Sequence, residues 1–379
     1  MPLHFWLWRA KSDNLPKPIM KRVIVAISGG IDSGVAAALL KESGFEVIGA
    51  FMRLWQEPAK ASFNTGPKGR GPEFRARELA KILKIPLFVF DFKKEFRKKI
   101  VDYFLKEYKK GETPNPCVVC NREIKFGLLL KKAQEIGADF IATGHYARKE
   151  KDRKTGLFNL LRAKDKNKDQ SYFLWQLEQK QLSRVLFPVG DYKRAEVEKM
   201  AKKLKLAPIL GIKKSLEICF VEKGVNEFLK KHLKEKKGKV VTEKGEVIGE
   251  HPGIWFFTIG QRKRIVSCLH SQWRARGPFY VLAKEKKTNT LIVTRDIKKV
   301  FQKGLALKRV NWISGKKPKF PLRVMAKIRY RQNCSRAMVK PLSSKKYILL
   351  FKRPQKAATP GQSAVFYQGN KLLGGGIIE

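Results

Sequence analysis

The sequence predicts an α/β protein: a doubly wound parallel sheet comes first, followed by a small α+β central domain and a C-terminal antiparallel β-barrel. Strand-like and helix-like segments alternate up to about residue 220, which is typical of a parallel sheet with helices on both faces. From about residue 277, short alternating apolar runs are separated by turn residues at near-regular intervals, as in a barrel. A length of 379 residues also exceeds one ordinary domain.

The elements of the first domain follow one another in a regular order. The expected strands are 21–27, 46–55, 85–92 and 138–146. The expected helices are 32–43, 73–84, 93–111 and 122–137. After residue 220, a lysine-rich helix is expected at 227–239, leading into the short strands of the second domain.

The composition is strongly basic. Lys and Arg number 82 against 33 Asp and Glu, which gives a formal net charge of +49. Such a protein attracts polyanions, nucleic acids above all. A general lysine bias would raise the charge without forming a site, and composition alone does not separate the two. The longest apolar runs fall well short of the ~18 residues of a membrane span, so no membrane partner is expected.

The five cysteines are odd in number and irregularly spaced, so they do not form a disulfide framework, and a reducing, cytoplasmic location is expected. The apolar stretch 5–8 is too short for a secretory signal, and the segment is poor in the Ser and Arg of a mitochondrial presequence. Met20 directly precedes the first strand and is an alternative start. We therefore treat residues 1–19 as a disordered extension or a misassigned start, outside the functional argument.

The segment SGGIDS (28–33) joins the first strand to the first helix, an arrangement that suits phosphate binding. Its glycines let the backbone approach closely, its serines add hydroxyl donors, and the helix start offers unpaired N–H groups. Asp32 can hold the Mg²⁺ that accompanies a nucleotide. The loop lacks both the Gly-Lys-Ser/Thr and the Gly-x-Gly-x-x-Gly signatures. The alternative is a serine-capped turn without a ligand, but Asp32 and the apolar strand favour a phosphate site.

The segment TPNPCVVCN (113–121) places Cys117 and Cys120 three residues apart. A closed zinc site needs two more soft ligands, and the chain has neither a second Cys-x-x-Cys nor a His-x₃₋₅-His pair. A thioredoxin-like redox pair belongs in a different strand–helix pattern. A single reactive thiol is the third interpretation: Asn121 is a good helix cap, which would place Cys120 at the positive end of a helix, where a thiol pKa falls. The third interpretation is favoured, and the other two stay open at this point.

Residues 26–33 (AISGGIDS) resemble the PP-loop of ATP pyrophosphatases, enzymes that adenylate a carbonyl oxygen and release pyrophosphate. From residue 21 to the end, further segments resemble the bacterial tRNA-specific 2-thiouridylases, and they appear in the family's order. These segments are EVIGAFM (46–52), TPNPCVVCNREIKFG (113–127), GADFIATGHYAR (137–148), KDQSYFLWQL (168–177), LFPVGDYKRAEVEKMA (186–201), EICFVEKG (217–224), TIGQRK (258–263), RYRQ (329–332) and TPGQSAVFYQGNKLLGGGIIE (359–379).

The resemblance implies an adenine nucleotide α-hydrolase-like PP-loop catalytic domain at 20–221, a central tRNA-binding domain at 222–290 and a C-terminal β-barrel domain at 291–379. It implies ATP-dependent 2-thiolation of the wobble uridine of tRNA, with Lys, Glu and Gln acceptors. The reaction would proceed by adenylation of O2 and persulfide sulfur transfer, with release of AMP and pyrophosphate. The implied cofactors are ATP with Mg²⁺, without a structural metal. The implied sulfur donor is a cysteine desulfurase or a sulfur-relay protein.

The resemblance also implies roles for individual residues. It makes Cys120 the nucleophile and Cys219 the carrier of the persulfide, with a transient disulfide between them. The implied ATP-binding residues are Ala26, Ile27, Ser28, Gly29, Gly30, Ile31, Asp32, Ser33, Met52 and Gly144. The implied contacts with the target base and tRNA are Asn115, Pro116, Cys117, His145, Lys168, Asp169, Gln170, Arg329, Tyr330 and Gln362. Cys117 replaces an aspartate that some family members carry as a general acid/base, a role that a thiol with a pKa of ~8.5 hardly fills at neutral pH.

Two segments depart from the family pattern. Residues 56–74 replace a stretch that carries cysteine and aspartate, and residues 264–277 replace a glycine-rich run of the central domain. Two other functions were weighed. A PP-loop amide synthetase acting on a small molecule explains SGGIDS and ATGHY but not PNPCVVCN. A basic RNA-binding protein without catalysis is disfavoured by the joint presence of both cysteines with Asp32 and Ser33.

Overall fold

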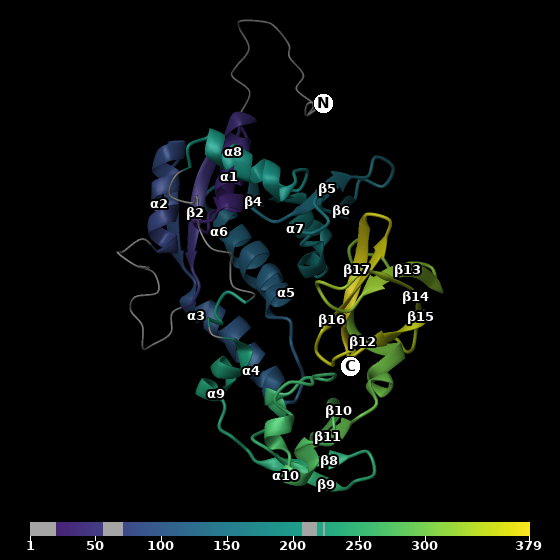
Figure 1. Ribbon diagram of the computed structural model, residues 1–379. Coiled ribbons are helices and arrows are strands. Elements are labelled where there is room, and N and C mark those ends of the chain that lie inside the picture. Colours follow the sequence, from purple (N-terminus) through teal and green to yellow (C-terminus); the bar gives the residue numbers. More distant parts are fainter. Residues whose placement is uncertain (1–19, 56–70, 207–217, 223) are drawn as a thin grey trace, which may run out of the picture.

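The computed structural model describes residues 20–55, 71–206, 218–222 and 224–379 (Figure 1). A five-stranded sheet forms the core of the first domain, in the order β3-β2-β1-β4-β7. Its strands are β1 (Arg22–Ala26), β2 (Glu46–Arg53), β3 (Leu87–Asp91), β4 (Phe140–Thr143) and β7 (Val185–Leu186). All neighbouring pairs are parallel. The predicted parallel sheet is therefore confirmed. The strand order reverses at β1 and β4, which is where sheets of this kind bind ligands.

Helices cover both faces of the sheet, as predicted for a doubly wound fold. Val23 and Val25 of β1 face a cluster that includes residues of α1 (Ile31–Glu42), α2 (Pro72–Leu83) and α8 (Arg194–Lys203). Ile24 and Ala26 face the other cluster. Alternate residues of β1 thus enter different cores, as the two-residue period of a strand requires.

Two long helical segments lie on the second face. The first comprises α3 (Lys93–Phe96), a π-helical stretch (Arg97–Val101) and α4 (Asp102–Lys109). The second comprises α5 (Pro116–Cys120), a π-helical stretch (Asn121–Leu128) and α6 (Leu129–Glu135). Apolar residues of both segments, such as Phe104 and Phe126, are fully buried in the shared core. The second segment carries the paired cysteines and so sets their position.

The predicted start of this second segment, near Arg122, is wrong. The helix begins at Pro116, after Asn115, and Asn121 has helical dihedral angles (φ −61°, ψ −50°) inside it. The side chain of Asn121 donates to the carbonyl of Phe173 at 3.0 Å, so it is not a cap. Proline is well suited to the first helical position, because it has no N–H to leave unpaired. Pro116 is therefore the true start signal.

The central domain is built on a four-stranded sheet in the order β10-β11-β8-β9. Its strands are β8 (Gly238–Thr242), β9 (Val247–His251), β10 (Tyr280–Glu285) and β11 (Thr290–Thr294), and its helices are α9 (Val225–His232) and α10 (Ser271–Arg274). The helix predicted at 227–239 is therefore too long at its C-terminal end. Leu233 is extended, and the lysines that follow would repel one another along a helix face.

The C-terminal domain is a closed antiparallel barrel, as predicted. Its six strands are β12 (Phe301–Trp312), β13 (Leu322–Lys327), β14 (Ser335–Pro341), β15 (Tyr347–Lys356), β16 (Ser363–Gln368) and β17 (Lys371–Ile378). They follow the order β12-β15-β14-β13-β16-β17, and pairing of β12 with β17 closes the ring. Closure leaves no free sheet edge among these six strands.

One hairpin of the first domain continues the barrel sheet. β5 (Ala147–Lys151) pairs with β6 (Phe158–Arg162), and β6 pairs with β17 through Leu160 and Leu161. α7 (Gln179–Ser183) follows the hairpin in sequence. At the boundary between the central domain and the barrel, β11 still pairs with β8 of the central sheet. We therefore propose that the central domain extends to Thr294 rather than ending at the predicted residue 290.

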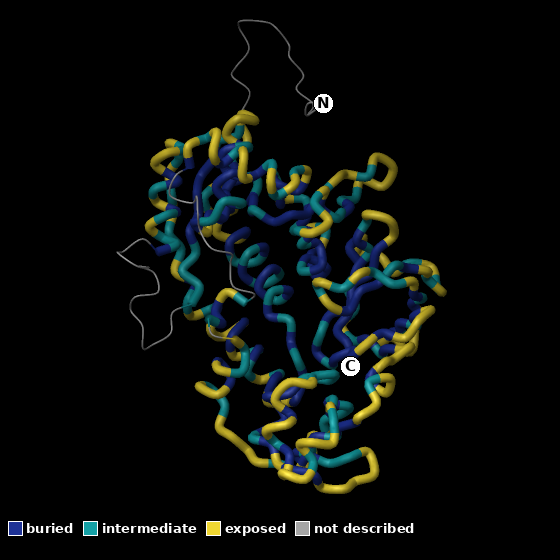
Figure 2. The backbone as a smooth tube through the Cα atoms, in the orientation of Figure 1, coloured by how far each residue is buried: buried dark blue, intermediate teal, exposed yellow. Residues whose placement is uncertain are grey.

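All three domains meet at the loop that precedes α5. The carboxylate of Glu112 lies 3.6 Å from the ammonium of Lys286 in the central domain and 3.5 Å from that of Lys308 in the barrel. The backbone N–H of Thr113 donates to the carbonyl of Pro360 in the barrel at 2.8 Å. Buried residues continue through this junction, whereas the outer turns of the central domain are exposed (Figure 2). None of the helices in the described ranges is long and apolar enough to span a membrane.

Candidate active site

The nucleotide loop turns sharply between β1 and α1. The hydroxyl of Ser33 holds the turn closed: it accepts from the backbone N–H of Ser28 at 3.1 Å and donates to the carbonyl of Gly30 at 3.0 Å. Gly29 has a φ of +72°, and a Cβ there would lie 2.4 Å from the carbonyl oxygen of Pro72. Both conditions require glycine at position 29. Ser33, predicted to contact phosphate, uses its hydroxyl inside the loop in this structure.

The other predicted nucleotide contacts share one edge of the sheet with this loop. A Cβ on Gly144 would lie 2.6 Å from the backbone carbonyl carbon of Asp32 and 2.7 Å from the nitrogen of Ser33, so the chain after β4 packs directly on the start of α1. Met52 is half-buried near the end of β2. Because β1, β2 and β4 are parallel neighbours, all three parts lie at their carboxyl ends, where nucleotides bind in such folds.

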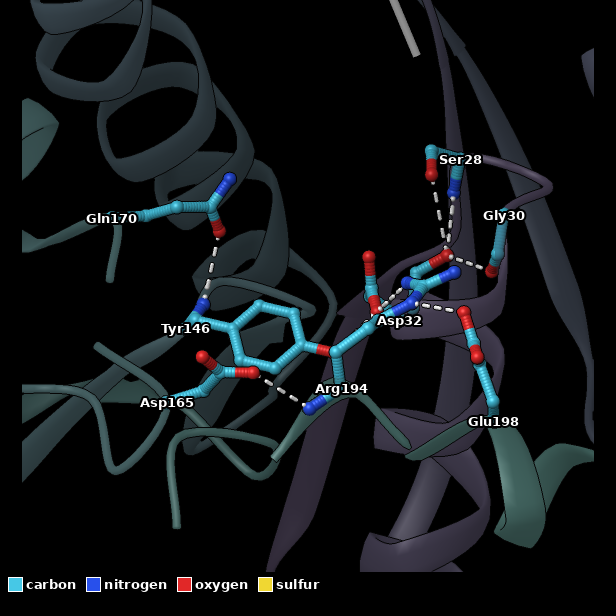
Figure 3. A network of polar contacts seen from close by, with 9 residues as sticks. Ser28, Gly30, Asp32, Tyr146, Asp165, Gln170, Arg194 and Glu198 are labelled. Atoms are coloured by element: carbon cyan, nitrogen blue, oxygen red, sulfur yellow. Dashed lines mark hydrogen bonds and ion pairs between the residues drawn. The ribbon is translucent and has the colours of Figure 1, made fainter. Parts of the chain in front are cut away.

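Asp32 is engaged by two residues whose role the sequence did not reveal (Figure 3). Its Oδ1 accepts a hydrogen bond from the Tyr146 hydroxyl at 2.7 Å and forms an ion pair with the Arg194 guanidinium. Burial, and then the charge of Asp32, raises the pKa of the Tyr146 phenol, which therefore donates as a neutral hydroxyl. Both partners lie far from Asp32 in sequence, so no local spacing could have revealed them.

Three cysteines gather beside this edge. Cys117 and Cys120 lie one turn apart on α5, the first half-buried and the second buried. Cys219 is exposed on the segment 218–222. The charge of a Cys219 thiolate acts on both Cys117 and Cys120, so folding brings these distant positions together. All three are free thiols.

The prediction of a lowered pKa for Cys120 is wrong. Burial raises the pKa of the Cys120 thiol to about 12 and that of Cys117 to about 11. Because the helix begins at Pro116, Cys120 lies beyond its first turn, where the dipole effect fades. Forming the Cys120 thiolate in this environment costs roughly 4 kcal/mol more than in water.

Lys125 is the cation of this cluster, and sequence reasoning did not single it out. Its charge lowers the pKa of all three thiols, and at Cys117 and Cys120 it acts against the effect of burial. It also acts on His145, whose pKa burial holds well below its usual value. His145 follows Gly144 directly, so the charge of Lys125 acts both on the thiols and on the residue next to the nucleotide loop.

The positions predicted to contact tRNA lie where the segment 168–173, the start of α5 and the barrel meet. The ring of Tyr330 in the barrel packs against that of Phe173 at a tilt of 44°, with 4.5 Å between ring centroids. Gln362 donates from Nε2 to the carbonyl of Thr113 at 2.9 Å, and Asn115 hydrogen-bonds the phenol of Tyr172. Pro116 is buried at the first position of α5. The structure thus brings most of these positions into one junction.

Several of these side chains already have protein partners. His145 is buried, with its Nδ1 2.8 Å from the Thr143 hydroxyl, so in this conformation its ring does not reach the surface. The carboxylate of Asp169 accepts a hydrogen bond from the backbone N–H of Ser171 at 3.1 Å. The side-chain oxygen of Gln170 accepts one from the backbone N–H of Tyr146 at 3.0 Å. The exposed Arg329 donates to a barrel carbonyl at 2.8 Å. Lys168 is half-buried beside them.

Metal ligands are sparse in the part of the chain that the structure describes. No group of three or more His, Cys, Asp or Glu side chains suited to a metal occurs there. The zinc interpretation of the cysteine pair therefore gains no further ligands in those ranges. Asp32 presents a carboxylate whose side chain is 36% exposed, and carboxylate oxygen suits Mg²⁺. Of the two segments that depart from the family pattern, residues 56–70 lie outside the described ranges.

Comparison with known families matches the three parts of the chain in turn. The family described as "tRNA methyl transferase HUP domain" matches residues 21–223. The "tRNA methyl transferase PRC-barrel domain" matches residues 226–295, and the "Aminomethyltransferase beta-barrel domain" matches residues 302–378.

Curated relatives match nearly the whole chain. The tRNA-specific 2-thiouridylase MnmA of Geobacillus thermodenitrificans is 43% identical, over 96% of this chain and 95% of the relative. The proteins of the same name from Clostridioides difficile and Moorella thermoacetica are 41% and 42% identical, over 95% and 94% of this chain and 98% and 99% of their own. With this identity over almost its full length, the chain belongs to the tRNA-specific 2-thiouridylase family.

Proposed function

We propose that the chain catalyses ATP-dependent 2-thiolation of the wobble uridine of tRNA, with Lys, Glu and Gln acceptors. The observation that carries the proposal is the gathering of Cys120 and Cys219 beside a PP-loop. A nucleotide loop alone would suit many ligases, and a thiol pair alone would suit many redox proteins. The two together suit sulfur transfer to a carbonyl carbon that has first been activated by adenylation.

The first step is activation of the base. The O2 oxygen of uridine attacks the α-phosphorus of ATP, the bond to the bridging oxygen breaks, and pyrophosphate leaves. The loop at 28–33 and the start of α1 would hold the phosphates, and Asp32 would hold the accompanying Mg²⁺, which neutralises charge on the leaving group. Adenylation replaces a poor leaving group on C2 with AMP.

The second step transfers sulfur. A donor protein first transfers sulfur to Cys219, which becomes a persulfide. The terminal sulfur of this persulfide attacks C2 of the uridine while AMP departs. The Cys120 thiolate then attacks the Cys219 sulfur, the persulfide S–S bond breaks, and its electron pair stays on the transferred sulfur as the thiocarbonyl. A Cys120–Cys219 disulfide remains, and a thiol reductant must reduce it before the next turnover. Covalent relay of this kind divides one difficult step into easier ones.

The target uridine must leave the anticodon stack to reach such a site. The junction of the segment 168–173, α5 and the barrel supports tRNA binding, because exposed Arg329 and the half-buried ring of Tyr330 suit phosphates and unstacked bases. We further propose a cysteine desulfurase or sulfur-relay protein as donor and the cytoplasm as location. The exposure of Cys219 suits delivery of sulfur by a second protein.

Two matching family descriptions mention methyl transfer, whereas the curated relatives quoted above are named thiouridylases. Free thiols beside a PP-loop favour sulfur transfer, because methyl transfer requires neither adenylation nor a persulfide carrier.

The test is direct. The protein is incubated with ATP, Mg²⁺, a sulfide donor and an anticodon-stem tRNA, and the digested RNA is analysed by mass for 2-thiouridine. Wild type should form it, Cys120→Ser and Cys219→Ser should form less than about one hundredth as much, and Cys268→Ser, in the central domain, should match wild type. ATP–pyrophosphate exchange without RNA would favour a small-molecule ligase. RNA binding without AMP release would favour a non-catalytic RNA-binding protein.

A further inference from the structure

The carboxylate of Asp32 is covered by a cation from another helix (Figure 3). Arg194 is the first residue of α8, and its guanidinium pairs through Nη1 with Asp32. The Nε of Arg194 pairs with Glu198 one turn further along, at 2.7 Å. Its backbone N–H donates to the carboxylate of Asp165 at 2.9 Å. The start of α8 is therefore held to α1 through the Asp32 ion pair and to Asp165 through its backbone N–H, while Glu198 of the same helix orients the guanidinium.

The charges at this point pose a problem for an anionic substrate. ATP carries several negative charges, and a bare carboxylate at the mouth of the phosphate loop would repel it at short range. Asp32 therefore needs a cationic partner whenever Mg²⁺ does not neutralise it. Arg194 is such a partner, and its side chain is 26% exposed, so it is not locked in the core.

A guanidinium has properties that a simple tie between helices does not require. Its planar donors match the oxygens of a phosphate as well as those of a carboxylate, and it stays charged under all physiological conditions. The two side chains can therefore exchange partners when the nucleotide binds. Mg²⁺ would then bind the carboxylate of Asp32, and the phosphates would bind the guanidinium of Arg194. Asp165 would keep the start of α8 in place during the exchange, and Glu198 would continue to pair with the Nε of Arg194.

We propose that Arg194 binds the pyrophosphate portion of ATP, and that Asp32 holds its side chain beside the phosphate loop until the nucleotide arrives. The assignment rests on the proposed function, because it concerns the same adenylation site. Arg194 thereby stabilises the leaving group, on which negative charge develops as the α-phosphorus is attacked.

The competing explanation is structural: the Asp32–Arg194 pair would merely fasten α8 to α1. The two explanations differ in which ligand loses affinity. A phosphate contact affects ATP but not AMP, which lacks the β- and γ-phosphates. A structural tie affects both nucleotides alike and lowers the melting temperature.

The experiment measures binding of α,β-methylene-ATP and of AMP by calorimetry, with Mg²⁺, to wild type, Arg194→Gln, Arg194→Lys and Lys199→Gln. Lys199 is exposed on the same helix, so its variant is a control of equal charge. We expect Arg194→Gln to lose about tenfold or more in affinity for the ATP analogue, as loss of a charged hydrogen bond implies, with AMP changed less than about twofold. Arg194→Lys should lie in between, because it keeps charge without the planar donors.

If the unpaired carboxylate destabilises Arg194→Gln, the double variant Asp32→Asn/Arg194→Gln restores the melting temperature without restoring the discrimination between the ATP analogue and AMP. Equal losses for both nucleotides, or no loss, would overturn the assignment while wild type still forms 2-thiouridine. Failure of wild type to bind either nucleotide would instead overturn the proposed function and the assignment with it.

Discussion

At the scale of single residues, the surroundings of Cys120 hold it as a neutral thiol. Burial raises its pKa to about 12, so only a minute fraction is thiolate at pH 7. The thiolate is the reactive form. For the nucleophilic role proposed above, we expect substrate binding to lower this pKa, through hydration or a closer approach of Lys125.

We predict that Lys125 sets the reactivity of the cluster. With pKa values near 11 and 12, the thiolate fractions of Cys117 and Cys120 rise about tenfold per pH unit from pH 7 to 9, so alkylation by iodoacetamide should accelerate over this range without a plateau. Lys125→Met raises these pKa values further and should slow alkylation about two- to tenfold at each pH. Peptide mass spectrometry measures the rate at each cysteine. Lys131→Met, exposed on α6, is the control, and an equal effect there would refute the prediction.

What the sequence could reveal about single residues depended on how far away their partners lie. The glycines and Asp32 of the nucleotide loop were recognisable because strand, loop and helix are contiguous. Arg194 and Tyr146 were not, because each meets Asp32 only through the fold. The acidity of Cys120 was misjudged for the same reason: its burial depends on distant segments of the core.

At the scale of elements, the helix that carries Cys117 and Cys120 is positioned by the barrel. Gln362, just before β16, donates from Nε2 to the carbonyls of Thr113 and Pro114, at 2.9 and 3.3 Å. Thr113 in turn donates its N–H to the barrel at 2.8 Å. The segment leading into α5 is thus hydrogen-bonded to a domain more than two hundred residues away in sequence.

We predict that Gln362→Ala slows thiolation while leaving nucleotide binding intact. Loss of two hydrogen bonds to the segment before α5 loosens the position of the thiols and should lower kcat for 2-thiouridine formation about tenfold, whereas affinity for α,β-methylene-ATP stays within about twofold. Gln368→Ala, at the exposed end of β16, is the control. An unchanged kcat together with a raised Kd for tRNA would show that Gln362 contacts RNA and does not position the helix.

Element types were largely predictable, because hydrophobic periodicity and turn residues are local. Element ends were less so. Asn121 and Pro116 both resemble helix start signals. The helix begins at Pro116, and the Asn121 side chain donates a hydrogen bond to the distant carbonyl of Phe173, which the local sequence does not reveal. The lysine-rich helix was extended past His232 for a similar reason: helix propensity is high there, but no apolar face continues.

At the scale of the whole molecule, charge is the dominant property. A net charge of +49 should make RNA binding strongly dependent on salt, because each phosphate contact releases counterions. We predict that affinity for tRNA falls at least about tenfold between 50 and 200 mM salt, with a linear log–log plot. Filter binding over this range measures the slope. Affinity for the ATP analogue, the control, should change far less, and a flat tRNA plot would show that the charge is a general bias.

Glu112 links the three domains through one side chain. Its single carboxylate is shared between lysines of the central domain and the barrel, and it lies in the loop that leads into the helix of Cys117 and Cys120. A rotation that carries Lys286 or Lys308 away from the nucleotide-binding domain lengthens one of these two ion pairs. Strain from such a movement reaches the thiols through a few residues of backbone. We therefore expect domain rotation on tRNA binding to be coupled to the position of the thiols.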